Sequence, residues 1–175
     1  INTDIGGFVT NDMLIAPTNR SANHHFLQNY FDATKTGACV RIAGAGVKSQ
    51  ITFAADWIAS AGKQGTGNIE AVGLHVTNEG TYSDINVDNL RVYNNSGTGV
   101  LIEATNFDCT WVGGSIRSNG NAAATNKNGF KWAPVGVSSI GPKLTGVNFS
   151  GNALDDISVS ANGRNYSVVG GSVES

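Results

Sequence analysis

Two aspartates, Asp84 and Asp108, lie 24 residues apart, and each directly precedes a short run of alternating apolar and polar residues. If both side chains point outward from neighbouring strands, two carboxylates lie side by side. Like charges at that range raise the pKa of one group, which leaves a general acid beside a general base. A carboxylate separation of about 5 to 5.5 Å suits a retaining glycosidase, and one of about 6.5 to 9.5 Å an inverting one. We therefore take Asp84 and Asp108 as candidate catalytic residues, with turn capping by the same side chains as the simpler alternative.

Three charged residues near this pair are candidates for contacts with a substrate. Asp88 follows Asp84 on the same face of its strand and can join the site. Arg91 and Arg117 occupy neighbouring copies of one sequence pattern, two positions apart. A guanidinium group binds a carboxylate through two parallel hydrogen bonds, so either arginine suits an acidic sugar. Solvated surface charge is the alternative for both.

Aromatic side chains are a second class of candidate contact, because their faces can stack on sugar rings. Tyr93 occupies an outward-facing position of its strand and ranks first. Trp57 and Trp132 are further candidates, whereas Trp111 occupies an inward position and is expected in the core. The substrate-binding prediction therefore comprises Tyr93, Arg91, Arg117, Asp88 and Trp57.

A sequence repeat places these residues on successive units of one architecture. The segment 84–95 (DINVDNLRVYNN), shifted by 24 residues, matches 108–119 (DCTWVGGSIRSN). Further shifts of 33 and 24 residues reach 142–152 and 166–175, again without internal gaps. Each unit is too small to bury its apolar face alone, and stacking of units gives a continuous core. The repeat predicts short parallel strands joined by Gly and Asn bends, with stacked asparagines bonding between coils.

A second set of matches completes the unit and shows where the pattern weakens. Glycines 37, 67, 99 and 129 each precede a short alternating run, and the nine residues 120–128 form an insertion in one turn. Upstream, residues 50–60 fit as strand if the register slips by one, with an amphipathic helix as the alternative. The same loose register places His24 and Gln50 in the column of Asp84 and Asp108, which extends a polar stripe.

The pattern V-x-N-L-x-V-x-N-N…G-V-x-I resembles the right-handed parallel β-helix of the pectate-lyase-like superfamily, and most of all bacteriophage tailspike and appendage proteins. The resemblance is close over 83–175 and looser over 24–82, within one domain spanning 1–175 that we expect to belong to a longer chain. It implies an all-β solenoid of about five to six coils that acts on long polysaccharides from an outer face. It also implies a homotrimer, a bacterial surface polysaccharide as partner, and a place in the virion tail after assembly in the host cytoplasm. A secreted bacterial protein is the alternative.

Composition excludes several other classes of function. The net charge of −2 and the 14 % of charged residues provide no basic field for nucleic acid. No apolar run approaches the length needed to cross a membrane, so no membrane insertion is expected. Residues 44–49 (GAGVKS) lack the spacing of a phosphate loop, and the pair His24–His25 is a poor metal site. We therefore expect no cofactor and no metal, and we expect Cys39 and Cys109 to be free thiols.

Three functions follow from these observations. The first is a tailspike or appendage domain that binds host polysaccharide and depolymerises it, by hydrolysis rather than lyase chemistry. The second is a non-catalytic receptor-binding or adhesion module on the same solenoid. The third is a bacterial pectate-lyase-like enzyme, which needs acidic clusters for calcium and a basic residue for proton abstraction. Neither of these requirements is evident in the sequence.

Overall fold

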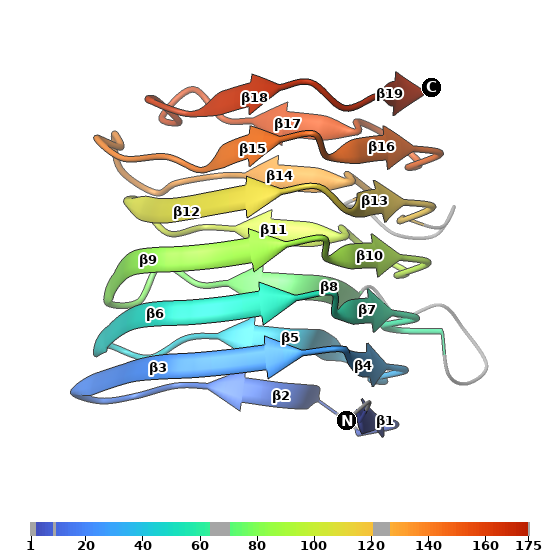
Figure 1. Ribbon diagram of the computed structural model, residues 1–175, viewed down its shortest axis with the longest axis horizontal. Helices are drawn as coiled ribbons and strands as arrows, with labels where there is room; N and C mark the ends of the chain where they lie inside the picture. Colours follow the sequence, from blue (N-terminus) through green and yellow to red (C-terminus); the bar gives the residue numbers. More distant parts are fainter. Residues whose placement is uncertain (1–2, 9, 64–70, 121–126, 175) are drawn as a thin grey trace.

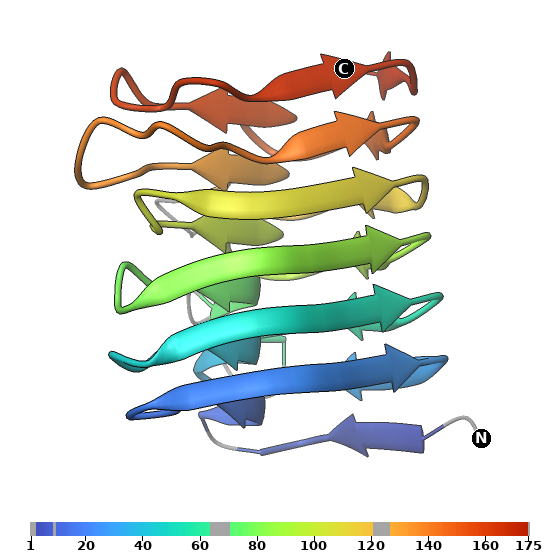
Figure 2. The same cartoon turned by 60° about the vertical axis from the view of Figure 1, so that its left-hand side comes forward.

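The chain folds into a right-handed parallel β-helix, seen in a computed structural model that describes residues 3–8, 10–63, 71–120 and 127–174 (Figures 1 and 2). Its strands form three parallel sheets along the stack, and the chain visits the sheets in a fixed order. Six such turns and one further strand are described. The predicted all-β solenoid of about five to six coils is confirmed.

The three sheets are named here by their order in the chain. The first sheet contains β1 (Thr3–Gly6), β4 (Asn29–Asp32), β7 (Trp57–Ala59), β10 (Arg91–Tyr93), β13 (Ser115–Arg117), β16 (Asn148–Ser150) and β19 (Val173–Glu174). The second contains β2 (Asn11–Ile15), β5 (Gly37–Ile42), β8 (Ala71–Val76), β11 (Val100–Ile102), β14 (Phe130–Trp132) and β17 (Ile157–Val159). The third contains β3 (Arg20–Leu27), β6 (Val47–Ala54), β9 (Thr81–Asp88), β12 (Phe107–Val112), β15 (Lys143–Thr145) and β18 (Ser167–Val169).

The backbone pairing follows the sequence repeat over its regular part. Val87 pairs with Trp111, and Val92 pairs with Ile116, as the shift of 24 residues predicts. These side chains point inward and are buried, because alternation along a strand places every second residue in the core. The segment 50–60 is extended within β6 and β7, so the strand prediction is confirmed there and the helical alternative is wrong.

Residues with positive φ make each corner between the third and first sheets. They are Gln28, Ala55, Asn89 and Gly146, with φ between 52° and 65°, and the pairs Gly113–Gly114 and Gly170–Gly171, with φ between 65° and 84°. A left-handed residue turns the chain sharply, and Gly or Asn adopts that conformation at the lowest steric cost. This corner sets the angle between the outer face of the third sheet and that of the first.

Stacked asparagines line the next bend, as predicted. Asn95 Nδ2 donates to Asn119 Oδ1 over 2.9 Å, and Asn119 Nδ2 donates to Asn152 Oδ1 over 2.9 Å. The backbone N–H of Ala61 donates to Asn95 Oδ1, and Asn152 Nδ2 donates to Asp156 Oδ1. Asn95 and Asn119 are fully buried, so the ladder satisfies polar groups that water does not reach.

Two predicted registers are wrong upstream. Val40 pairs with Leu74 and Leu74 with Val100, so Gly73, rather than Gly67, lies in the column of Gly99 and Gly129. Gly67 itself lies outside the described residues, as does most of the 120–128 insertion. His24 pairs with Ile51, which places Asn23 in the column of Gln50. Asn23, Gln50 and Asp84 share one column and all have positive φ, and the register of this sheet shifts at the next coil, between Phe107 and Cys109.

Candidate functional site

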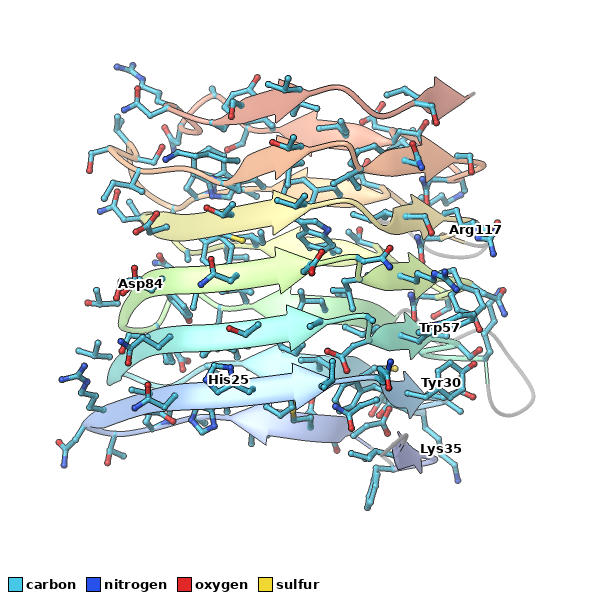
Figure 3. The ribbon with its side chains drawn as sticks, in the orientation of Figure 1. His25, Tyr30, Lys35, Trp57, Asp84 and Arg117 are labelled. Atoms are coloured by element: carbon cyan, nitrogen blue, oxygen red, sulfur yellow. The ribbon has the colours of Figure 1, made fainter. Side chains whose placement is uncertain are left out.

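Four of the five predicted substrate-binding residues lie together on the outer face of the first sheet. Trp57 on β7 pairs directly with Arg91 on β10, and Tyr93 on β10 pairs directly with Arg117 on β13. Outward positions alternate with the buried column that contains Ile58 and Val92, so both pairs face solvent. Figure 3 shows Trp57 and Arg117 at the same end of the coils.

Tyr30 on β4 belongs to the same group and was missed from the sequence. It pairs with Trp57 in the backbone, and their rings meet edge to face with centroids 6.0 Å apart. Trp57 and Tyr93 make a second edge-to-face contact at 5.6 Å. The hydroxyl groups of Tyr30 and Tyr93 lie 2.9 Å apart and share a hydrogen bond. The sequence signal that could have identified Tyr30 is the alternation over 29–32, which places its side chain outward. The loose match of the repeat in this part of the chain obscured that signal.

Two guanidinium groups cover aromatic rings of this group. The Arg91 Cζ atom lies 4.6 Å from the Trp57 ring centroid, and the Arg117 Cζ atom lies 5.9 Å from that of Tyr93. Both arginines are exposed, whereas Trp57 and Tyr93 are partly buried. We call Tyr30, Trp57, Tyr93, Arg91 and Arg117 the aromatic–arginine patch. It combines ring surface with two positive charges, a combination that suits sugars bearing acidic groups.

The predicted catalytic residues lie on a different face, that of the third sheet. Ile85 pairs with Cys109, so Asp84 and Asp108 directly precede paired residues on neighbouring coils, at a bulge in β9. Asp84 is exposed with a φ of 53°, and Asp108 is partly buried. Asp88 is exposed at the end of β9, about 13 Å along the strand from Asp84 at 3.3 Å per residue. Figure 3 shows Asp84 far from Trp57 and Arg117 across the coil.

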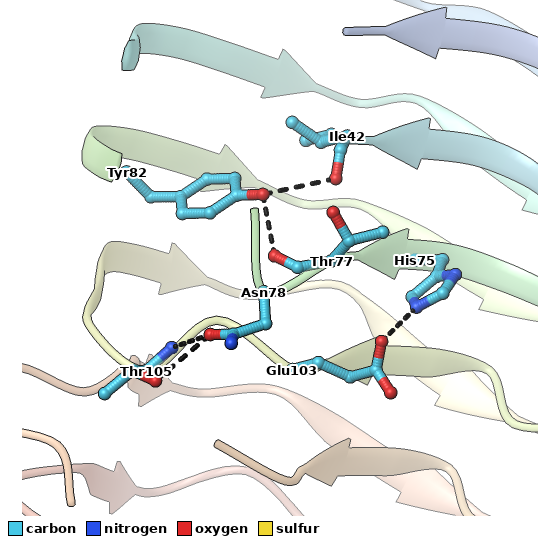
Figure 4. Close-up of polar contacts among 7 residues, drawn as sticks. All are labelled: Ile42, His75, Thr77, Asn78, Tyr82, Glu103 and Thr105. Carbon is cyan, nitrogen blue, oxygen red and sulfur yellow. Dashed lines mark hydrogen bonds and ion pairs between the residues drawn. The ribbon is translucent and has the colours of Figure 1, made fainter. Parts of the chain in front are cut away.

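Three further side chains have structural roles. Trp132, a predicted stacking platform, is fully buried, and its Nε1 donates to the Ala104 carbonyl over 3.2 Å, so that prediction is wrong. Glu103 accepts a hydrogen bond from His75 Nε2 over 2.8 Å on the outer face of the second sheet (Figure 4). Asp156 ends the asparagine ladder.

The corner between the second and third sheets contains a buried lysine that the sequence did not reveal. Lys48 is fully buried, and its Nζ donates to the carbonyl groups of Gly44 and Glu79. It also lies 4.4 Å from the Tyr82 ring centroid. Burial lowers the pKa of the Lys48 ammonium, and the Glu79 carboxylate partly offsets this. The segment 44–49 therefore closes a corner of the coil and is not a phosphate loop.

The Tyr82 hydroxyl forms hydrogen bonds in the same corner as Lys48. It donates to the carbonyl group of Thr77 over 2.7 Å and reaches that of Ile42 at 3.4 Å (Figure 4). Burial raises the pKa of Tyr82 to about 12. In the following turn, Asn78 Oδ1 accepts hydrogen bonds from the backbone N–H and hydroxyl of Thr105. These hydrogen bonds fix the corner between the second and third sheets.

Three other features bear on the type of site: metal-ligating groups, membrane-spanning helices and cysteines. The part of the chain that the structure describes contains no group of three His, Cys, Asp or Glu side chains placed to hold a metal ion. Within the same residues, no helix is long and apolar enough to span a membrane. Cys39 and Cys109 are buried and free, as predicted, and burial raises the pKa of both thiols. His24 bonds to Ser21 and stacks on Phe26.

Comparisons with protein-family models, with curated proteins and with solved structures find no match to this chain.

Proposed function

We propose that this β-helix is a bacteriophage tailspike or appendage domain that binds a polysaccharide of the bacterial surface. The observation that supports binding most directly is the aromatic–arginine patch. It presents three aromatic rings and two guanidinium groups on a single outer face, drawn from strands β4, β7, β10 and β13. Parallel coils hold these side chains at a regular spacing, so the patch matches a polymer better than it matches a small molecule.

The assignment to a virion tail rests on the resemblance of the repeat to tailspike proteins. The same resemblance implies a homotrimer and assembly in the host cytoplasm. A secreted bacterial protein is the alternative. The free buried thiols of Cys39 and Cys109 are compatible with folding in a reducing compartment.

Hydrolysis of the bound polymer is a second candidate function, carried by Asp84 and Asp108. The two residues are on neighbouring coils, whose backbones lie about 4.8 Å apart in a sheet. A separation of the two carboxyl groups of about 5 to 5.5 Å would give a retaining enzyme, and one of about 6.5 to 9.5 Å an inverting enzyme. In either scheme one carboxylic acid protonates the leaving oxygen, while the other carboxylate attacks the sugar in a retaining enzyme or activates water in an inverting one. A polymer that reaches both the pair and the patch has to cross the corner at Asn89.

The test is incubation of the purified chain with a panel of capsule and O-antigen polysaccharides, followed by measurement of binding and by mass spectrometry of products. We expect Trp57→Ala and Tyr93→Ala to weaken binding about tenfold or more, because each change removes a ring of the patch together with the platform under its arginine, and truncation of a central aromatic contact residue can cost about 2 kcal/mol. Tyr166→Ala is the control, because Tyr166 is an exposed aromatic residue outside the patch. Absence of binding to every polysaccharide in the panel would contradict the proposal.

The products separate binding from catalysis. Oligosaccharides that have gained water establish hydrolysis, and Asp84→Asn and Asp108→Asn should then each reduce kcat by about 100-fold or more. Asp88→Asn is the control for loss of an exposed carboxylate on the same strand. Unsaturated products would exclude the two-carboxylate mechanism and favour a lyase. Bound but intact polysaccharide would identify a recognition module, and the aspartate variants would then bind normally.

A further inference from the structure

Two of the three rings in the aromatic–arginine patch have a guanidinium group over them. Arg91 lies over the Trp57 ring, and Arg117 lies over the Tyr93 ring, each from the coil that follows. The remaining ring edges of Tyr30, Trp57 and Tyr93 are turned toward one another in edge-to-face contacts. A sugar that stacked on Trp57 or Tyr93 would therefore have to displace an arginine. The outermost groups of the patch are the two cations.

A cation–π contact favours the position of a guanidinium group over a ring and uses none of its N–H donors. Arginine suits such contacts because its planar charge is delocalised and weakly hydrated. An arginine held over a ring has lost part of its rotamer freedom before a ligand arrives, so less entropy is lost on binding. Its N–H groups match the two oxygens of a carboxylate. The patch is thus an ordered set of anion-binding donors.

No acidic side chain of the described residues neutralises these two arginines. Neither Arg91 nor Arg117 forms an ion pair within the part of the chain that the structure describes. Asp56, which precedes Trp57, is fully buried and accepts three hydrogen bonds, from the backbone and side-chain N–H groups of Asn29 and from the backbone N–H of Ala54. Its carboxylate is therefore used inside the corner and does not compete for the arginines.

The two cations also have a defined spacing. Arg91 and Arg117 are on neighbouring coils and are offset by two residues along the strand. With coils about 4.8 Å apart and a rise of about 3.3 Å per residue, their Cα atoms lie about 8 Å apart, on a diagonal to the helix axis. A polymer with carboxylates on more than one sugar can contact both arginines at once, which a single acidic sugar bound at one arginine does not. Such a chain would run over the coils obliquely along the stack.

We infer that the patch recognises an anionic polysaccharide through its carboxylates, with Arg91 and Arg117 as the recognising groups and the aromatic rings as their platforms. This inference rests on the proposed function and names its substrate class. It assigns Trp57 and Tyr93 a positioning role rather than direct stacking on sugar.

The experiment measures binding of the full chain to polygalacturonate, alginate and polysialic acid, each beside its carboxyl-reduced form, with a neutral dextran in parallel. At least one acidic polymer should bind, and carboxyl reduction should weaken that binding about tenfold or more. Arg91→Gln and Arg117→Gln should each cause a similar loss and reduce the dependence of affinity on salt. Arg164→Gln, which removes an exposed arginine outside the patch, should leave binding unchanged.

The outcomes distinguish this inference from the proposed function. Equal binding of native and carboxyl-reduced polymers, or of the wild type and the two glutamine variants, would overturn anion recognition while polysaccharide binding stands. Absence of binding to every acidic polymer would overturn anion recognition, whereas the proposed function is overturned by absence of binding to the capsule and O-antigen panel. A second readout is the fluorescence of Trp57, the partly exposed tryptophan, since Trp111 and Trp132 are buried. Trigalacturonate should change this signal, and a neutral galactose trisaccharide should not.

Discussion

Asp12 on β2 is a partly buried acid whose surroundings favour its neutral form. Burial raises its pKa to about 6, and the Asp32 carboxylate adds to this shift. Hydrogen bonds from the Cys39 thiol, the Phe8 backbone N–H and Thr34 act in the opposite direction but do not cancel it. The folded protein therefore holds a proton on Asp12 at a pH where the unfolded chain has lost it.

We predict that Asp12 makes the stability of the protein pH-dependent between about 4 and 6. Because the folded pKa lies above the ordinary value of 3.8, its stabilising contribution is complete below pH 4 and is lost as pH rises through 6. The loss should be on the order of 1 to 3 kcal/mol. Urea unfolding of Asp12→Asn should be less sensitive to pH in this range than that of the wild type. Asp88→Asn, at an exposed site, should follow the wild type, and identical pH profiles for all three would refute the prediction.

At the scale of the element, the bend from the first to the second sheet depends on glycine packed against asparagine. A Cβ atom on Gly99 would lie 2.6 Å from Asn119 Nδ2 and 2.8 Å from the Gly129 carbonyl oxygen. The same holds one coil earlier, where a Cβ on Gly73 would meet Asn95 Nδ2 at 2.7 Å. Glycine and asparagine therefore recur together at this bend, because the buried asparagine amide occupies the space that a side chain on the glycine would need.

Gly99→Ala should consequently destabilise the protein by about 1 to 3 kcal/mol, the usual cost of overpacking a well-packed site. Gly136→Ala is the matched control, because its nearest heavy atom would be an ordinary 3.5 Å away on Thr105. Thermal unfolding followed by circular dichroism gives the comparison. If Gly99→Ala and Gly136→Ala lower Tm equally, the asparagine ladder does not set the packing at this bend.

At the scale of the molecule, the outer surface carries apolar side chains that the solenoid itself does not cover. Val135 and Val137 are 68 % and 61 % exposed in the connection between β14 and β15, and Ile140 in the same segment is 45 % exposed. Clustered exposed apolar residues commonly mark contact surfaces. They are compatible with the proposed homotrimer.

Sedimentation analysis should therefore give a particle of three times the chain mass of 18.1 kDa. Replacement of both Val135 and Val137 by serine should shift the protein toward the monomer. Leu14→Ser removes an exposed leucine from the second sheet and should leave the trimer intact. A monomer at all concentrations for the wild type would contradict the homotrimer, and a stable trimer of the double variant would exclude this segment as its contact.

Spacing along the chain was enough to predict the repeating coil and much of its inner surface. Alternation over 83–175 predicted which residues point inward, and the recurrence of Asn95, Asn119 and Asn152 predicted the ladder, because both depend on spacing along the chain. It also placed Tyr93 and Arg117 on an outer face.

Which residues of neighbouring coils lie opposite each other could not be read from the sequence where insertions and bulges interrupt the repeat. The pairing of Leu74 with Val100 places Gly73 in the column of Gly99, and the loose upstream match concealed Tyr30 as the neighbour of Trp57. The burial of Lys48 likewise depends on the carbonyl groups of Gly44 and Glu79 that neighbouring coils place around it. Contacts between coils join residues distant in sequence, and a local pattern of alternation contains no information about which residue of the next coil lies opposite.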